Sequence, residues 1–296
     1  MLRQRLSGLA TLFLWLTLTT GAAQAASFSY YNGGFSTSAQ AGAEVSGANT
    51  DFNSAEDSGR SNAVGLAGAS SEYSWDNYAH SQVQTGGSVW SNDPGALQFS
   101  MISLVEVESE FTDAIDWFGR GQGSVRTNYD GTDGLFYKIA ANNPGESIGD
   151  RVEVRIYYEG NMDKSRGAFS DIDNFAKLGE LSITVNGRSA WVRPEVGLEG
   201  YDADEYSYKT KIQGDVITAH IGDIIGVFSD VSSEFGIEGF VDIEDESTMG
   251  RAYASHYLEL NADAFTTNPV PLPGTFLLLA FGLTSLTAIR RKQNNY

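Results

Sequence analysis

The side chains best suited to chemistry in this sequence are carboxylates that alternate along one stretch. If residues 97–111 form a strand, Glu106, Glu108 and Glu110 lie in a row on one face, because successive strand residues point to opposite faces. Paired carboxylates can hydrolyse glycosidic bonds, so a polysaccharide-acting enzyme is one hypothesis. A row of acids on a strand is more often only a solvated face, and we expect no catalytic role for it.

Histidine adds little support for catalysis. His80, His220 and His256 are far apart in the sequence, and His256 falls on an otherwise apolar strand face, so we expect structural roles. No H-E-x-x-H, G-x-S-x-G or P-loop motif is present. Serine and aspartate are abundant, so a catalytic triad stays open, but no spacing selects one. We predict a protein that is not an enzyme.

Acidic loops make Ca²⁺ the better chemical hypothesis, because Ca²⁺ takes six to eight oxygen ligands. None of these loops has EF-hand spacing, and turn formation alone also explains them. No other cofactor is expected. The candidate ligands are Asp130, Asp133, Asp171, Asp173, Asp242 and Asp245.

Carbohydrate binding is a further hypothesis, because aromatic rings stack on sugar rings. Aromatic residues on strands more often belong to the core, and the sequence does not separate the two roles. The candidate rings are those of Trp75, Tyr78, Trp90, Trp117 and Trp191.

Alternating apolar and polar residues predict the strands that must position these groups. Residues 97–111 alternate throughout, with a bulge near Ser103 left open, and residues 151–159 alternate again. Asn186-Gly187 between two alternating runs predicts a hairpin. Residues 32–71, rich in Gly, Ala, Ser and Asn, favour weakly specified strands with mobile loops, or partly disordered chain. We predict an all-β fold, an antiparallel, jelly-roll-like β-sandwich in a single domain, residues 26–260.

Charge and cysteine content restrict the partners. Residues 26–269 hold all 38 acidic residues and 14 of the 19 basic ones, a formal charge of −24. Such a segment repels nucleic acid and anionic lipid, so we expect no nucleic-acid partner. There is no cysteine, which excludes disulfides, thiolate metal sites and a cysteine nucleophile.

The N-terminus has the three parts of a secretory signal peptide. Arg3 and Arg5 precede an apolar run over residues 9–18, and small residues follow. Ala23 and Ala25 fit the A-x-A pattern, which predicts cleavage between Ala25 and Ala26. An uncleaved signal anchor is the alternative.

The C-terminus carries a short apolar segment that ends in cations. Residues 275–289 are uncharged and are followed by Arg290, Arg291 and Lys292. This pattern predicts a transmembrane helix with the C-terminus inside, because the basic residues can reach the headgroups. A buried element of a soluble domain is the alternative. Residues 261–269 are predicted to link this tail to the sandwich.

The order of parts in the tail resembles the PEP-CTERM sorting signal of Gram-negative bacteria. A proline motif, an apolar helix and an arginine cluster follow one another, with Leu272 where that family usually has an acidic residue. The resemblance covers only residues 270–296. It implies recognition by an exosortase, which would cut near the proline motif. The motif residues are Val270, Pro271, Leu272, Pro273, Gly274, Arg290 and Arg291.

Together these features predict an exported protein, transiently anchored with its N-terminus outside and then held at the cell surface or in the exopolysaccharide matrix. Its expected role is structural or adhesive, with the exosortase, the membrane and exopolysaccharide as partners. A calcium-dependent carbohydrate-binding module is the main alternative, and a polysaccharide-acting enzyme the next.

Overall fold

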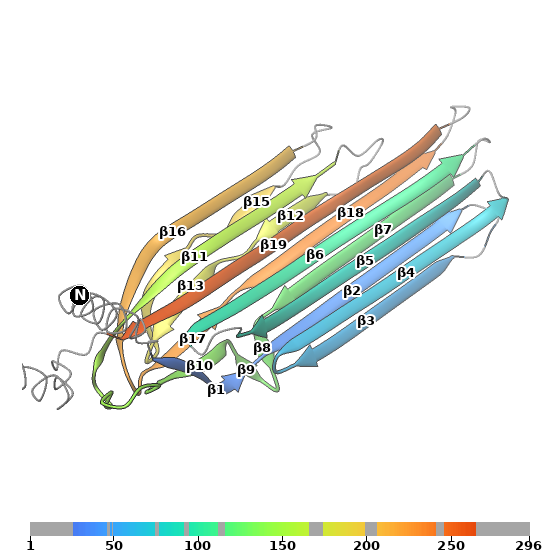
Figure 1. The fold of residues 1–296 in the computed structure, drawn as a ribbon. Helices are drawn as coiled ribbons and strands as arrows, with labels where there is room; N and C mark the ends of the chain where they lie inside the picture. The colour runs from blue at the N-terminus through green and yellow to red at the C-terminus, as the bar shows by residue number, and fades with distance from the viewer. Residues whose placement is uncertain are drawn as a thin grey trace, which may run out of the picture.

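The chain folds into an antiparallel β-sandwich whose long strands run side by side (Figure 1). The computed structural model describes residues 26–45, 48, 50–74, 77–91, 95–111, 116–165, 174–198, 206–240 and 246–264. Within these ranges every regular element is a strand, which confirms the all-β prediction. The predicted signal helix (1–25) and sorting tail (270–296) lie outside them. None of the described residues forms a helix of the length and apolarity that a bilayer crossing requires.

Two six-stranded sheets form the layers of the sandwich. The first sheet has the order β16-β11-β19-β6-β5-β4 and the second has the order β15-β12-β18-β7-β2-β3. The strands of the first sheet are β4 (Asn62–Ser74), β5 (Asn77–Trp90), β6 (Ala96–Phe111), β11 (Arg151–Lys164), β16 (Tyr206–His220) and β19 (Glu246–Ala264). Those of the second are β2 (Phe35–Val45), β3 (Asp51–Gly59), β7 (Asp116–Arg126), β12 (Phe175–Leu178), β15 (Val196–Leu198) and β18 (Asp230–Phe240).

A five-stranded end sheet, with the order β1-β10-β17-β13-β14, continues the second layer at one end of the molecule (Figure 1). β1 runs into β2 through Gly34, and β17 runs into β18 through Ser229. At this junction the Thr127 backbone N–H donates to Ser229 O (2.9 Å), and the Ser229 N–H donates to Thr127 Oγ1 (3.0 Å). The remaining elements are β1 (Ser27–Gly33), β10 (Leu135–Ala140), β13 (Leu181–Val185), β14 (Arg188–Arg193), β17 (Ile224–Phe228) and the small hairpin β8 (Asn128–Tyr129) and β9 (Thr132–Asp133).

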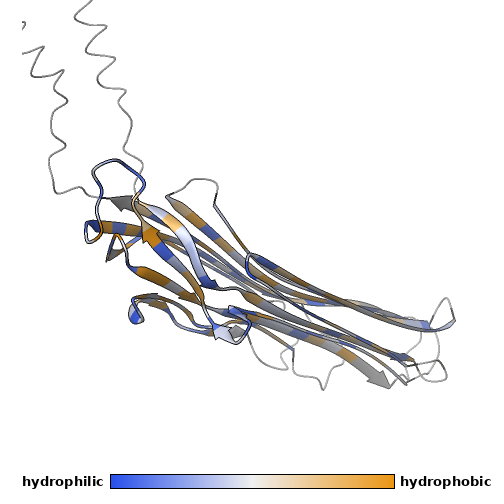
Figure 2. Ribbon diagram, turned by 90° about the horizontal axis from the view of Figure 1, so that it is seen from below, coloured by the Kyte–Doolittle hydropathy of each residue, from blue (hydrophilic) through white to orange (hydrophobic). Residues whose placement is uncertain are grey.

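The alternation predicted for residues 97–111 is confirmed in β6 for residues 97–109. Leu97, Phe99 and Met101 are buried between the layers, whereas Ile102 on the opposite face is 37% exposed. Figure 2 shows the same alternation of apolar and polar bands along the strands. The bulge considered near Ser103 is absent, since the pairing of β6 with β5 and with β19 is regular there.

The hairpin predicted at Asn186-Gly187 is also confirmed. β13 and β14 pair on either side of it, and both turn residues have positive φ (50° and 76°). This left-handed backbone is what a two-residue hairpin turn requires.

Of the two expectations for residues 32–71, strands are confirmed and partly disordered chain is wrong for the described residues, which form most of β2, β3 and β4. Small side chains on β2 and β4 fill a thin part of the core. Gly121 on β7 lies opposite Ala41 of β2, and a Cβ at Gly121 would lie 2.5 Å from Val105 Cγ1 on the first sheet. Where the layers are this close, many inward positions hold Gly, Ala or Ser, which made the segment look unspecific in the sequence.

The domain boundary predicted at residue 260 is also corrected. β19 continues to Ala264, and Arg155↔Asn261 and Val154↔Ala262 pair in the ladder with β11. Ala262 is buried, so the first residues of the expected linker belong to the sandwich.

Candidate functional site

Several large apolar side chains are exposed on the solvent face of the first sheet. Exposed apolar side chains that lie close together can mark an interaction site. Because alternate residues of its strands face outward, the residues next to these apolar side chains face the core. The large apolar residues on this face that are more than a third exposed are Val64, Leu66, Trp90, Ile102, Val216 and Met249.

Three aromatic rings form a row across this face, which we call the aromatic row: Trp90 on β5, Tyr257 on β19 and Tyr157 on β11. The ring centroids of Trp90 and Tyr257 are 6.3 Å apart, and those of Tyr257 and Tyr157 are 5.9 Å apart. Trp90 is 38% exposed and both tyrosines are half-buried, so each ring presents part of its surface to solvent. The sheet fixes these rings, because their neighbours Leu258 and Tyr158 are anchored in the core.

Both tyrosine hydroxyls of the aromatic row are hydrogen-bonded to carboxylates. Tyr257 Oη donates to Glu259 Oε2 (3.1 Å), and Tyr157 Oη donates to Glu159 Oε1. Lys211 Nζ on the edge strand β16 lies 3.4 Å from Glu159 Oε1 and 4.8 Å from the centroid of the Tyr157 ring. Rings, carboxylates and an ammonium group are thus combined on one part of the sheet surface.

The protonation of these groups follows from their contacts. Burial, followed by the hydrogen bond to Glu259, raises the pKa of Tyr257 to about 12. The hydrogen bond from Tyr157 holds the pKa of the Glu159 carboxyl below its usual value. Hydrogen bonds with Tyr157 and Glu159 raise the pKa of Lys211. At neutral pH the row therefore carries a neutral Tyr257 phenol bonded to Glu259, together with the charged Glu159 and Lys211.

A groove lies at the opposite end of the same face, and we call it the far groove. It has a volume of about 480 Å³ and is lined by His80, Gln82, Glu108 and the apolar Met249, among others. Tyr78, beside it, donates to Glu108 Oε1 (3.3 Å), and its ring centroid is 4.8 Å from that of His80. The lining of the groove therefore combines apolar side chains, such as Met249, with polar ones.

The far groove includes two members of the predicted carboxylate row, Glu106 and Glu108. Both come from β6 and point to the same solvent face, as the alternation predicted. Glycosidase carboxylates instead flank the bond that they cleave. The arrangement does not have that geometry.

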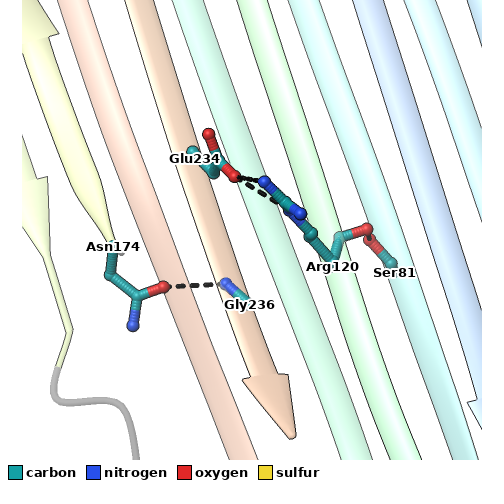
Figure 3. Close-up of polar contacts among 5 residues, drawn as sticks. All are labelled: Ser81, Arg120, Asn174, Glu234 and Gly236. Atoms are coloured by element: carbon teal, nitrogen blue, oxygen red, sulfur yellow. Dashed lines mark hydrogen bonds and ion pairs between the residues drawn. The ribbon is translucent and has the colours of Figure 1, made fainter. Parts of the chain in front are cut away.

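Part of the second sheet carries polar groups that bond to one another (Figure 3), and elsewhere on its outer face the exposed Phe52 packs against Phe118, with ring centroids 5.9 Å apart. Arg120 on β7 donates through Nε (2.8 Å) and Nη2 to Glu234 Oε1 on β18, and Glu234 is nearly buried. Asn174 Oδ1 accepts from the Gly236 N–H at 2.8 Å. These groups satisfy each other, which makes this face a weaker candidate for ligand binding.

Two of the six calcium candidates, Asp130 and Asp133, lie in the described part of the chain. Asp130 has φ = 50° in the β8–β9 turn and lines one groove with Glu56 and Asp57, whereas Asp133 lines another with Asp230. No group of three or more acidic or histidine side chains among the described residues could hold a metal ion. The other four candidates, Asp171, Asp173, Asp242 and Asp245, lie outside the described ranges.

The aromatic candidates fall into different environments. Trp117 is buried in the core, and Trp191 Nε1 donates to Asp215 Oδ2 (2.8 Å) at the sandwich edge. Trp75 lies outside the described residues. Only Trp90 belongs to the aromatic row. Its partners Tyr157 and Tyr257 were missed, although their alternation with buried residues was a usable signal.

Two histidines have clear structural environments. His256 is buried, and its Nδ1 lies 3.0 Å from Tyr158 Oη. Burial lowers the pKa of His256 to about 4, so it is neutral at physiological pH. His220 Nδ1 lies 3.3 Å from Asp223 Oδ2 on the surface.

Comparisons with known proteins do not assign the chain to a family. No family model and no curated protein matches the chain. A solved structure described as "Crystal structure of the T13 IBDV viral particle reveals a missing link in icosahedral viruses evolution" is similar at 9% identity, over 90% of this chain and 88% of that chain. Its TM-score of 0.13 is too low to support an inference about fold or function.

Proposed function

We propose that the protein is exported and serves as a structural, adhesive protein of the cell surface or exopolysaccharide matrix, binding polysaccharide through the aromatic row. The proposal includes a jelly-roll-like topology, a cleaved signal peptide and a C-terminal membrane helix that an exosortase processes. The N- and C-terminal sequence patterns support the export and sorting part. The aromatic row supports the binding part.

The observation that carries the proposal is the combination of rings and hydrogen-bonding groups at the row. A sugar ring has apolar C–H faces and a rim of hydroxyls, so it needs an aromatic surface together with acceptors and donors. Trp90 offers the exposed ring surface, and Glu159 and Glu259 offer acceptors beside it. A shallow surface suits binding to a polymer better than catalysis on it.

The two alternative functions predict different experimental results. A calcium-dependent carbohydrate-binding module would lose its ligand on chelation of Ca²⁺. An enzyme acting on polysaccharide would shorten the polymer during incubation. Binding that resists chelation and leaves the polymer length unchanged favours the adhesive function.

A polysaccharide screen with the purified full-length chain tests the proposal. Trp90→Ala and Tyr257→Ala are expected to weaken retention on the bound polysaccharide about fivefold or more, since a stacked ring contributes about 1 kcal/mol. Tyr73→Ala is the matched control, because Tyr73 is 58% exposed but lies on β4, outside the row. If the unmodified protein and the three variants are all retained equally, the proposed site is wrong.

A further inference from the structure

The aromatic row and the far groove lie on the same face of the first sheet, and β5 contributes residues to both. On β5 the residues at even positions from Tyr78 to Trp90 point outward, while Ala79, Val83 and Val89 are buried. Tyr78 stands beside the far groove and Trp90 belongs to the aromatic row. The distance between them along the strand is about 40 Å.

The surface between the two ends is amphipathic. Gln82 and Gln84 expose amides along β5, and Gly86 leaves the backbone open to close approach, with no atom nearer than 3.6 Å to a Cβ built there. On the neighbouring strands Leu66 is 61% exposed and Ile102 is 37% exposed. An extended ligand would therefore meet apolar contacts and hydrogen-bonding groups along the whole strand.

The carboxylates on this face limit which polymers it can bind. Carboxylates lie at both ends, Glu106 and Glu108 at the far groove and Glu159 and Glu259 at the row. They would repel uronate-rich polymers, nucleic acid and anionic lipid, but they accept hydrogen bonds from sugar hydroxyls. A neutral chain of sugars matches both the charge and the alternation of apolar and polar groups.

From this arrangement we infer that the solvent face of the first sheet is a linear track for a neutral polysaccharide, with the far groove as a second binding station for the same chain. This rests on the proposed function and deepens it. A short oligomer occupies one station, whereas a chain long enough to reach both is held by two. Binding at two linked stations strengthens affinity beyond that of either one.

A length series of neutral β-glucan oligomers, titrated into the full-length protein, tests the track. The longest oligomers are expected to bind at least tenfold more tightly than the shortest. In a His80→Ala/Met249→Ala variant this advantage is lost, while the shortest oligomers still bind at the aromatic row, where Trp90→Ala weakens their binding. Both side chains are exposed, so the variant should fold; Tyr73→Ala serves as the matched surface control.

Each other outcome has a separate meaning. If the double variant keeps the advantage of long oligomers while Trp90→Ala weakens binding, the second station is refuted and the proposed function stands. If no oligomer of any length binds the unmodified protein, the inference and the proposed function both fail. If sedimentation shows a dimer that Trp90→Ala and Met249→Ala dissociate, the face serves a second copy of the chain and the track is wrong.

Discussion

The buried imidazole of His256 makes the stability of the sandwich sensitive to mild acid. Its side chain lies between the layers against Tyr158, and burial lowers its pKa from 6.5 to about 4. The unfolded chain therefore takes up a proton as the pH falls below 6.5, while the folded protein does not. The contribution of His256 to the free energy of unfolding is present above pH 6.5 and is lost between pH 6.5 and about 4.

The size of this loss follows from the two pKa values. Each unit corresponds to about 1.36 kcal/mol, so we expect a loss of about 2 kcal/mol at pH 5 and about 3 kcal/mol at pH 4. Urea unfolding at a series of pH values measures it. His256→Gln is expected to be less stable at pH 7 but to lack this part of the pH dependence.

His80→Gln is the matched control, because His80 is exposed on the surface of β5. Subtracting the free energies of unfolding of the two variants at each pH cancels the contribution of the carboxylates, which both variants share. If His256→Gln and His80→Gln lose stability equally between pH 7 and pH 4, the assignment of the acid sensitivity to His256 is wrong.

Three further substitutions test the packing of the layers, a buried hydrogen bond and a carboxyl group with a raised pKa. Gly121→Ala should lower the free energy of unfolding by about 1–3 kcal/mol, because its Cβ would lie 2.5 Å from Val105 Cγ1, whereas Gly68→Ala, with no atom nearer than 3.8 Å, should not; equal effects in urea unfolding would contradict the thin core. Ser103→Ala should cost about 1–3 kcal/mol by leaving Ser233 without its 2.7 Å partner, and the double change to Ala should cost less than the sum of the single ones; additive costs would exclude the coupling. Asp230→Asn should slightly stabilise the protein at neutral pH and lose that advantage in acid. Partial desolvation raises the pKa of this carboxyl, so its ionisation opposes folding, although its exposure to solvent keeps the effect small; a pH-independent difference would count against this.

The sequence predicted the architecture well wherever large apolar residues alternate with polar ones. The strand over residues 97–111, the strand over residues 151–159 and the hairpin at Asn186-Gly187 all have strong local signals. Residues 32–71 lacked such signals, because the layers approach too closely for large side chains. Ala41 and Ala43 do alternate with outward-facing residues, but alanine is only weakly hydrophobic, so the pattern is hard to recognise in the sequence.

The candidate site was predicted only in part. Trp90 was among the suggested rings, but the row depends on pairing that brings β5, β19 and β11 together across 167 positions of the chain. Period-two patterns show which residues share a face of one strand, but not which strands are neighbours. Asp130 and Asp133 were suggested as ligands because they are close in sequence, and in the structure Asp130 lines a groove with Glu56 and Asp57, which no local pattern indicated.

The most direct test of polysaccharide binding is to observe the Trp90 indole while the polysaccharide is added. The chain has five tryptophans, so ¹⁵N-indole labelling gives few NMR signals, and a Trp90→Phe variant assigns the relevant one. We expect the Trp90 signal to shift on binding, and that of the buried Trp117 to stay unchanged. Binding that leaves the Trp90 signal in place would contradict the aromatic row as the binding site.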